Sequence, residues 1–287
     1  MFERKYFIVA PRFHGVTLLS RLLNSHPQVV SLGDTYPSNR YEQACGCGVH
    51  VSACTFWNDI RARIESDRYA STPHMLPLLP DVLSTPFNER LLAHLPVATL
   101  RRLFPTAGMQ IFVSDFRRFL EAIYAHFQAA RPSVFVDGVK SSERVKALVC
   151  AGERVDGVLH VIRDPKDYVK SCSRIEGQDD LKSLIGFSRS WHRAHRYCGS
   201  LRKVGNYLRI DYEALCSDPD TTLDGIFRFM NVPSMTLTEL RRQPEQIWHS
   251  TGNVSMSAFN WSISARKHPA NTWEGFLIDA IARPATI

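Results

Sequence analysis

The alternation of short apolar segments with amphipathic segments constrains the fold of this chain more than any other feature of its sequence. Five segments rich in Val, Ile, Leu and Phe have the length and composition of buried strands, at residues 6–10, 28–32, 133–136, 158–162 and 206–210. Helical patterns separate them, at residues 16–24, 114–129, 141–151, 164–173, 181–197 and 221–230. This alternation predicts an α/β fold with a mostly parallel five-stranded sheet flanked by helices.

Residues 37–106, between the second and third predicted strands, form the least regular part of the sequence. They include many Pro, Cys and His residues and two short helical patterns, at residues 57–64 and 88–95. We interpret this part as a long insertion that could serve as a lid or as a wall of an acceptor site. Because no internal repeat or low-complexity linker interrupts the chain, we predict a single domain over residues 1–287.

Composition limits the class of protein and the kind of partner. Of the 287 residues, 44% are hydrophobic, as in globular domains, and no apolar run is long enough to span a membrane. The first strand pattern begins too close to the N-terminus to leave room for a signal peptide, so we expect a cytoplasmic protein with seven reduced cysteines. The formal charge of +7 suits an anionic small ligand, although a solvated surface excess explains it equally well, and no basic run indicates nucleic acid binding.

The loop after the first predicted strand, residues 11–17, is a candidate anion site. Ligands of open α/β sheets bind beyond the C-terminal ends of the strands, and this loop leads from such an end into a helix. The first N–H groups of that helix attract an anion because they have no partner within the helix. Gly15 permits close approach, Thr17 offers a hydroxyl and Arg12 offers a guanidinium. An ordinary strand-to-helix turn is the alternative for a loop with a single glycine.

A second candidate anion site follows the fourth predicted strand. Arg163 comes directly after that strand, and Asp164-Pro165 is a typical helix start. Ser171 lies eight residues beyond Arg163, about two helical turns, so the two side chains could donate to one phosphate. The alternative is a surface arginine and a serine that packs the helix.

These segments and several later ones resemble the sulfotransferases. FIVAPRFHGVTLL (residues 7–19) is similar to the sulfuryl-donor loop of that family, and VIRDPKDYVKS (161–171) is similar to its element for a 3′-phosphate. Further similar segments are LRIDYEALCSDPD (208–220), WHSTGN (248–253) and ACGCGVHVSACTFW (44–57), the last resembling an insert of bacterial members. The resemblance covers nearly the whole chain in the order of the family, which is much more specific than any single motif.

The resemblance implies a P-loop-kinase-like fold and an activity. Sulfotransferases move a sulfuryl group from PAPS (3′-phosphoadenosine-5′-phosphosulfate) to a hydroxyl or amine and release PAP, with no metal. For this chain we therefore expect a small-molecule acceptor. Such transfer resembles phosphoryl transfer, so positioning and electrostatic stabilisation would supply most of the acceleration.

The resemblance also assigns residues to the donor. The 3′-phosphate would bind Arg163 and Ser171, and Tyr212 would line the nucleotide pocket. Arg266 and Lys267 are the nearest basic residues for the closing loop, although the arginine that the family has just past Gly-Asn is absent. The 5′-phosphosulfate would bind Arg12 and the backbone of Phe13, His14, Gly15, Val16, Thr17 and Leu18.

Two further residues receive catalytic roles from the resemblance. Asp34 stands where many Golgi-type and bacterial members have a catalytic glutamate, so it is the predicted base, with a turn aspartate as the alternative. Lys140 follows the third predicted strand, where cytosolic members have a lysine ahead of a catalytic histidine. Ser141 and Ser142 follow it here, so that histidine is absent. Lys140 could polarise the transferring group or could be a solvated loop lysine.

The donor loop departs from the family pattern. Arg12 stands one position before the usual basic residue, Phe13 occupies that position, and His14 replaces a serine. Val16 replaces a Ser or Thr, which removes one hydroxyl. His14 could donate to the sulfuryl group, act as a second base, or pack on the loop. These changes also fit a weakened donor site.

Cys45, Cys47, His50 and Cys54 form a compact group in the sequence. Such residues suggest zinc, but C-x-C is not the usual C-x₂₋₄-C spacing, and similar bacterial inserts lack the histidine. A disulfide is a second alternative. We favour reduced cysteines and expect no metal.

Two other functions stay open at this point. A non-catalytic member of the same fold would bind the nucleotide and transfer nothing. A P-loop kinase would need a Gly-Lys-Ser loop and a metal-binding acid, and the loop of this chain lacks that sequence.

Overall fold

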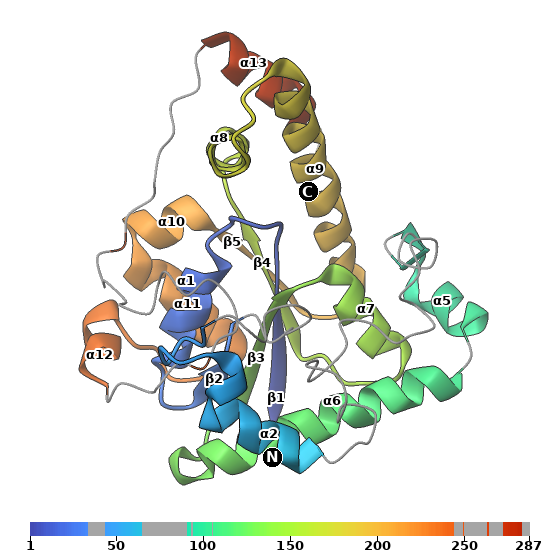
Figure 1. Cartoon of the computed structure of the whole chain (residues 1–287), viewed down its shortest axis with the longest axis vertical. Helices are drawn as coiled ribbons and strands as arrows, with labels where there is room; N and C mark the ends of the chain where they lie inside the picture. The colour runs from blue at the N-terminus through green and yellow to red at the C-terminus, as the bar shows by residue number, and fades with distance from the viewer. Residues whose placement is uncertain are drawn as a thin grey trace.

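The centre of the molecule is a five-stranded parallel sheet (Figure 1). A computed structural model describes residues 1–33, 44–64, 91–92, 94–104, 106–243, 249, 263 and 272–282. The strand order is β2-β3-β1-β4-β5, and every pair of neighbours is parallel. The predicted α/β fold with a five-stranded sheet is therefore confirmed. The strands are β1 (Arg4–Val9), β2 (Val29–Ser31), β3 (Val134–Lys140), β4 (Gly157–Ile162) and β5 (Tyr207–Asp211).

Strand β1 lies in the middle of the sheet and is buried on both faces. Side chains alternate along a strand, so Tyr6 and Ile8 belong to the core on one face, whereas Phe7 and Val9 belong to the core on the other. Two buried faces explain why this segment is apolar at successive positions instead of at every second one.

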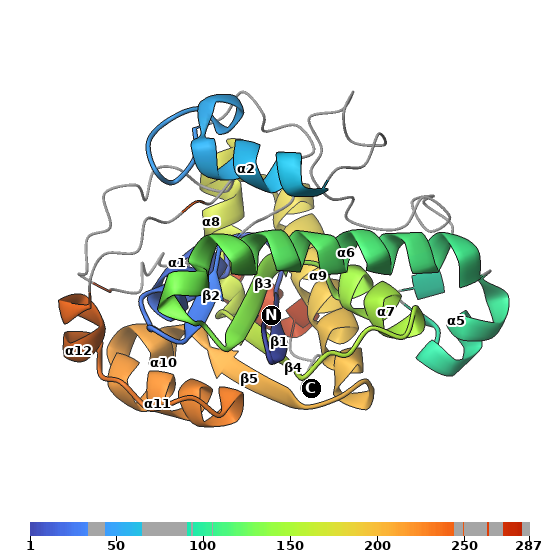
Figure 2. The same cartoon turned by 90° about the horizontal axis from the view of Figure 1, so that it is seen from below.

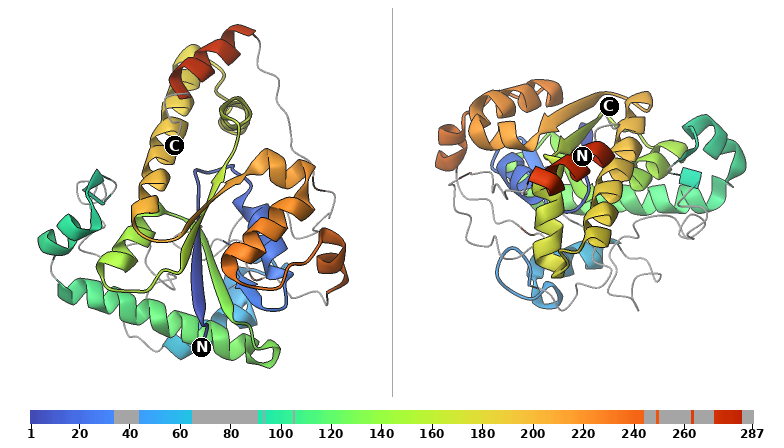
Figure 3. Two further views of the ribbon diagram at one scale, coloured as in Figure 1. Left: turned by 180° about the vertical axis from the view of Figure 1, so that it is seen from behind. Right: turned by 90° about the horizontal axis from the view of Figure 1, so that it is seen from above.

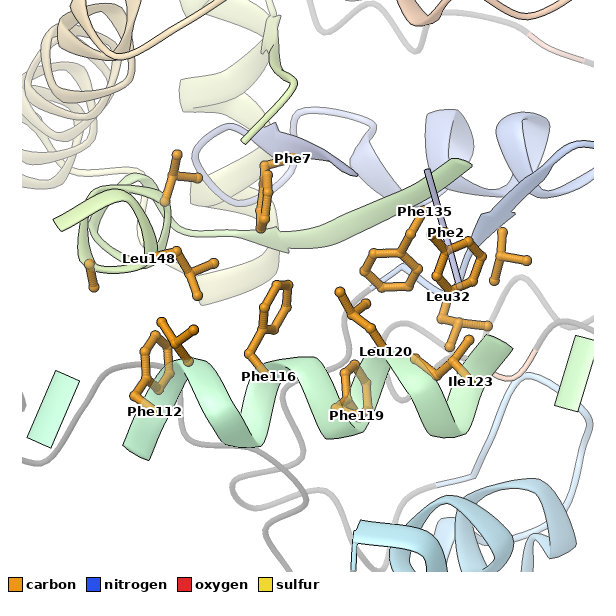
Figure 4. Packing of buried hydrophobic residues seen from close by; sticks show 14 of the residues in the cluster. Phe2, Phe7, Leu32, Phe112, Phe116, Phe119, Leu120, Ile123, Phe135 and Leu148 are labelled. Carbon is orange, nitrogen blue, oxygen red and sulfur yellow. The ribbon is translucent and has the colours of Figure 1, made fainter. Parts of the chain in front are cut away.

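Helix α6 (Thr106–Phe127) covers the face that Phe7 occupies, together with α7 (Ser142–Cys150). Figure 4 shows Phe116 and Leu120 of α6 on the side of the helix that faces Phe7 and Phe135 of the sheet. Phe116, Phe119 and Ile123 are all 0% exposed, as the three-to-four spacing of the apolar residues predicts. Burial of one such side chain stabilises the fold by about 1.5–3 kcal/mol.

A further layer lies outside α6. Helix α2 (Thr55–Ile64) packs on the side of α6 away from the sheet, as Figure 2 shows. The contact is made by Phe56, Trp57 and Ile60, each at most 1% exposed. The short elements of this region are η1 (Val51–Ala53), α5 (Val97–Leu103) and η3 (Gln128–Ala130).

The opposite face of the sheet is covered by α1 (Val16–Asn24) and α11 (Pro219–Met230). Their buried residues include Leu19, Leu22 and Phe227, each 0% exposed. The two short helices α10 (Tyr212–Ser217) and α12 (Leu237–Arg242) flank α11.

A third group of helices lies beyond the C-terminal ends of the strands (Figures 1 and 3). It consists of α8 (Pro165–Glu176), α13 (Thr272–Ala282) and the first turns of α9 (Leu181–Gly199). The end of α9 and the short η4 (Ser200–Lys203) return to the sheet, where Cys198 and Leu201 belong to the same core as Phe7. Helices α8, α9 and α13 share a small apolar cluster of their own, which includes Val169, Leu184 and Ile278. The group therefore forms a wall above the edge of the sheet where α/β proteins bind ligands.

Among the described residues, no helix has both the length and the apolarity needed to cross a lipid bilayer.

Candidate functional site

The β1–α1 loop, residues 10–15, has a tightly curled backbone. Phe13 and Gly15 are both left-handed, with φ of 63° and 77°. Gly15 is the N-cap of α1; among the described residues no side chain caps that helix start, and no acidic residue lies in its first turn. The N–H groups of Val16, Thr17 and Leu18 have no acceptor within the helix, because a helix leaves its first N–H groups unpaired. This helix start therefore has the electrostatics of an anion site.

Contact with Tyr212 explains why residue 15 is a glycine. A Cβ added to Gly15 would lie 2.2 Å from Cε2 of Tyr212, and the positive φ of Gly15 already disfavours any other residue. Burial raises the pKa of Tyr212 to about 12, so the phenol is protonated at neutral pH. The loop is thus backed by the aromatic ring that begins α10.

Arg163 connects this loop to the start of α8. Its Nη1 donates to the carbonyl oxygen of Phe13 at 2.9 Å, and its Cζ lies 5.2 Å from the centroid of the Tyr212 ring. The Arg163 side chain is only 6% exposed, and its backbone carbonyl accepts a hydrogen bond from Nε1 of Trp191 at 3.0 Å. A rigidly held guanidinium therefore lies beside the open start of α1, which favours binding of an anion.

The start of α8 is closed by carboxylates. Asp164 caps it, accepting hydrogen bonds from the N–H groups of Lys166 at 2.8 Å and Asp167 at 3.3 Å. Oε1 of Glu213 accepts from the N–H of Asp164 at 3.1 Å, and burial raises the pKa of Glu213. Ser171 lies on the buried side of α8, at 3% exposure. An anion near α8 would therefore depend on side chains such as Arg163 and Ser171, not on free backbone N–H groups.

His14 points away from the loop into a chain of buried rings that we call the histidine chain: His14, His195, His160 and Tyr207. Nε2 of His14 lies 2.9 Å from Nε2 of His195, and Nδ1 of His195 lies 2.7 Å from Nε2 of His160. Nδ1 of His160 is hydrogen-bonded to the Tyr207 hydroxyl. His14 is 1% exposed, and His160 and His195 are 0% exposed.

The carbonyl oxygen of Arg12, at one end of the histidine chain, determines which nitrogen of each ring carries a hydrogen. Nδ1 of His14 lies 2.9 Å from the carbonyl oxygen of Arg12, which can only accept, so this nitrogen carries the hydrogen. In neutral rings, Nε2 of His14 then accepts from His195, Nδ1 of His195 accepts from His160, and Nδ1 of His160 accepts from Tyr207. Burial lowers the pKa of His14 and of His160 to about 3 and lowers the pKa of His195 as well, so all three rings are neutral.

This arrangement corrects two of the roles considered for His14. Both of its ring nitrogens are engaged inside the protein, so it is placed neither to donate to a sulfuryl group nor to act as a base at the loop. Packing, the third interpretation, is what the geometry gives, including a contact with the Tyr168 ring at 4.9 Å between centroids. Phe13 likewise packs against the cluster of α8, α9 and α13, and the exposed Arg12 places its Cζ 5.1 Å from the Phe13 ring.

Sequence reasoning missed His160 and His195. His160 lies within a run of apolar strand residues, and His195 continues a buried stripe of α9 that contains Leu184, Ser188 and Trp191. Their positions on buried faces were the available signal, since a buried histidine requires a hydrogen-bond partner.

The ends of β1, β2 and β3 come together next to the loop. Lys140 is the last residue of β3 and has a left-handed φ of 75°. It lies opposite Val9 in the sheet register, and its carbonyl oxygen accepts a hydrogen bond from the N–H of Ala10 at 3.4 Å. A Cβ on Gly138 would lie 2.6 Å from the carbonyl oxygen of Gly33, so β2 and β3 approach closely there. Asp34, Arg266 and Lys267 lie outside the described residues.

The cysteine group of residues 45–54 includes a different histidine from the one the sequence suggested. The ligand atoms of Cys45, Cys47, Cys54 and His249 all lie within 4.8 Å of one another. His50 is exposed, and its backbone forms an antiparallel bridge with Ala44. All seven cysteines of the chain are free thiols.

The sequence matches no family model and no curated protein. The structure is similar to the sulfotransferase domain of the olefin synthase from Synechococcus PCC 7002, with 18% identity, a TM-score of 0.46, and coverage of 97% of this chain and 94% of that one. It is also similar to a sulfotransferase of Mycobacterium tuberculosis H37Rv, with 16% identity, a TM-score of 0.48, and coverage of 90% and 76%. A third similar structure is the sulfotransferase domain from the curacin biosynthetic pathway, with 14% identity, a TM-score of 0.43, and coverage of 98% and 97%. These neighbours belong to the family that the motifs resemble, but at such identities and TM-scores they establish no activity for this chain.

Proposed function

We propose that this protein is a PAPS-dependent sulfotransferase that acts on a hydroxyl or amine of a small-molecule acceptor. The observation that carries the proposal is the meeting of Gly15, Arg163 and Tyr212. These residues come from three separate segments of the sequence, each of which resembles a nucleotide-binding element of that family. Their convergence on one loop is what a single donor site requires.

In this proposal the two ends of the donor are held by different chemistry. The 5′-phosphosulfate would lie on the first N–H groups of α1, with Thr17 and Arg12 as additional donors. The 3′-phosphate would lie on the side chains of Arg163 and Ser171. Because Arg163 is hydrogen-bonded to the carbonyl of Phe13, the loop and the guanidinium form one unit that fixes the spacing of the two anions.

The transfer would be an in-line displacement at sulfur. The acceptor oxygen or nitrogen forms a bond to sulfur while the bond from sulfur to the bridging oxygen breaks, and PAP leaves with that electron pair. The acceptor proton would go to Asp34, the proposed base, which follows Gly33 in the chain. Helix α1 and Lys140 would stabilise the charge that develops on the bridging oxygen.

Two features of the described residues support such a site. Lys140 has a left-handed backbone at the end of β3, a conformation that costs about 1 kcal/mol or more in a residue with a side chain and is concentrated at functional sites. The histidine chain would make His14 a positioning residue, since its two ring nitrogens tie the loop to the carbonyl of Arg12 and to the ring of His195.

The second candidate is a nucleotide-binding protein of the same fold that transfers nothing. The presence of Phe13 and His14 at positions where the family has a basic residue and a serine favours it. A P-loop kinase is the weaker alternative and would show strict dependence on magnesium and ATP.

The proposal is tested by calorimetric titration of PAP into the wild-type protein and into Arg163→Ala. We expect the substitution to weaken binding by about 10- to 100-fold, since hydrogen bonds to a charged group contribute about 1.5–3 kcal/mol. Arg163→Lys should recover only part of the affinity, because a lysine keeps the charge and loses the planar fork.

Arg174→Ala is the matched control, because Arg174 is exposed near the end of the same helix. It should bind PAP like the wild type. Absence of PAP binding by the wild-type protein, or equal losses in both alanine variants, would contradict the proposal. PAP release from PAPS with a panel of phenols, alcohols and amines then separates the enzyme from the non-catalytic alternative.

A further inference from the structure

We propose that Cys45, Cys47, Cys54 and His249 bind one Zn²⁺ ion in a closed, structural site, the Cys3His site. The Sγ atoms of Cys45 and Cys54 lie 3.7 and 3.3 Å from Nδ1 of His249, and the Sγ atoms of Cys47 and Cys54 lie 3.6 Å apart. None of the four residues belongs to the β1–α1 loop or to the histidine chain.

Three of the distances between ligand atoms match the edges of a tetrahedron around zinc, and all four ligand atoms lie within 4.8 Å of one another. Bonds of about 2.3 Å to sulfur and about 2.0 Å to nitrogen give edges of about 3.8 Å between two sulfurs and about 3.5 Å between sulfur and nitrogen. The three distances given above lie within a few tenths of an ångström of these values. A disulfide would require about 2.05 Å between sulfurs, which is far shorter than the separation of Cys47 and Cys54.

The local backbone explains how a C-x-C pair can supply two ligands. The bridge between Ala44 and His50 closes a tight turn, inside which the N–H of Gly48 donates to the carbonyl of Cys45 at 2.9 Å. Gly48 has a φ of 93°, which favours glycine, so the chain reverses directly after Cys47. Both thiols are thereby presented on one turn, as in a metal-binding knuckle.

Cys54 and His249 complete the site from two other directions. Cys54 directly precedes α2, and the positive end of a helix stabilises a thiolate. The ring of His249 stacks on Phe56, with centroids 4.2 Å apart and an angle of 10° between the planes. This stacking fixes the direction of the imidazole toward the thiols.

Burial and donor type favour zinc and a structural role. Cys45 and Cys54 are at most 1% exposed and His249 is 8% exposed, whereas Cys47 is half-buried, so three of the four ligands are shielded from water. Three sulfurs and one nitrogen suit Zn²⁺, whereas Mg²⁺ and Ca²⁺ require oxygen ligands. Four protein ligands leave no open position for a reacting molecule, so the ion would act as a cross-link between His249 and the 44–64 segment, which packs on α6.

Metal analysis of the full-length protein, produced with zinc and purified without chelator, tests the site. We expect about one Zn²⁺ per chain in the wild type and a loss of most of it in Cys54→Ser. Cys150→Ser is the matched control, because Cys150 is a free, half-buried thiol outside the cluster, and it should retain the metal. Wild-type protein without metal, or Cys54→Ser with the full amount, would overturn the proposal.

A second measurement does not depend on the folding of the variant. Chelation of the wild-type protein should lower its Tm by roughly 10 °C, and added Zn²⁺ but not Mg²⁺ should restore it. Co²⁺ added to the chelated protein should give the visible absorption of a tetrahedral thiolate site. A Tm that is insensitive to both chelator and Zn²⁺, or a mass spectrum showing a bond between Cys47 and Cys54 in the native protein, would contradict the proposal.

Discussion

Helices α1 and α8 both begin at the C-terminal ends of central strands, yet their starts are opposite in electrostatic terms. The start of α1 is a left-handed glycine, with no side-chain cap among the described residues and no acid in the first turn. The start of α8 has Asp164 as its cap and Asp167 in its first turn. One helix start is open to an anion, and the other is closed by its own carboxylates.

The difference shows that the position of a helix start in an α/β sheet does not by itself make an anion site. Arg163 lies between the two starts and contacts the α1 side, through the carbonyl of Phe13. We therefore expect binding of the two phosphates of the proposed donor to depend on different features. Binding of the 5′-phosphate should depend on the charge in the first turn of α1, and binding of the 3′-phosphate should depend on side-chain donors.

The largest expected effect comes from making α1 resemble α8. Thr17→Asp places a carboxylate in the first turn of α1, where it would repel the 5′-phosphate of PAP. Two like charges about 4 Å apart at a protein surface repel by about 4 kcal/mol, so we expect PAP binding to weaken by at least about 100-fold. The free energy of unfolding should rise by about 0.5 kcal/mol, because an acid stabilises the start of a helix.

Titration calorimetry and urea denaturation measure the two effects of Thr17→Asp separately. Thr17→Asn is the control, because it has nearly the same shape without the charge. If both variants bound PAP equally well, the start of α1 would not be an anion site.

The second effect concerns the histidine chain, which holds the loop that precedes α1 and has no counterpart at the start of α8 among the described residues. In the unfolded chain a histidine binds a proton below about pH 6.5, whereas burial keeps the folded pKa of His14 and of His160 at about 3. The contribution of these two histidines to the free energy of unfolding is therefore fully present above about pH 6.5. It is lost progressively as the pH decreases toward 3. The slope is about 1.4 kcal/mol per pH unit for each of these histidines.

Urea denaturation at pH 7, 6 and 5 measures this slope. Replacement of His14 by Asn should reduce the slope relative to the wild type. His94→Asn, a change at an exposed histidine, should leave it unaltered. Equal slopes in all three proteins would mean that the histidine chain does not exclude protons in the folded state.

The smallest effect is expected from opening the start of α8. Asp164→Ala removes the cap of that helix and should lower the free energy of unfolding by about 1 kcal/mol. PAP affinity should stay within about threefold of wild type, a difference of about 0.7 kcal/mol. Asp180→Ala, which removes the cap of α9, is the control for binding. A loss of PAP affinity as large as that of Arg163→Ala would show that the α8 start itself helps to hold the phosphate.

Elements with a strong apolar signal were predicted well from the sequence. Helix α1 was predicted at its observed bounds, and each predicted strand overlaps an observed one. Helix α6 begins at Thr106, eight residues before the predicted start at 114, and its buried stripe also begins earlier, with Met109, Phe112 and Val113. The short helices α10 and α12 were missed, since six residues give almost no periodicity and their starts depend on the caps Asp211 and Thr236.

The candidate site was predictable only in part, for a physical reason. Gly15, Arg163 and Tyr212 each lie in a local motif, so their segments could be recognised one at a time. His160 and His195 lack such a motif, because hydrogen bonds between distant residues leave no local pattern. For the same reason, the sequence indicated His50 as the histidine of the cysteine group, because His50 is near the cysteines in sequence. The histidine that lies among the cysteines in the structure is His249.

The single direction of the hydrogen bonds in the histidine chain has an evolutionary consequence. Serine at position 14, as in the family pattern, would leave Nε2–H of His195 without its acceptor, and an unpaired buried donor costs about 1–3 kcal/mol. Replacement of His195 alone would leave Nε2 of His14 without its donor and Nε2–H of His160 without its acceptor. Positions 14, 160 and 195 are therefore expected to be epistatic. Single substitutions between this loop and the usual one pass through less stable intermediates, so we expect the residues of the histidine chain to change together.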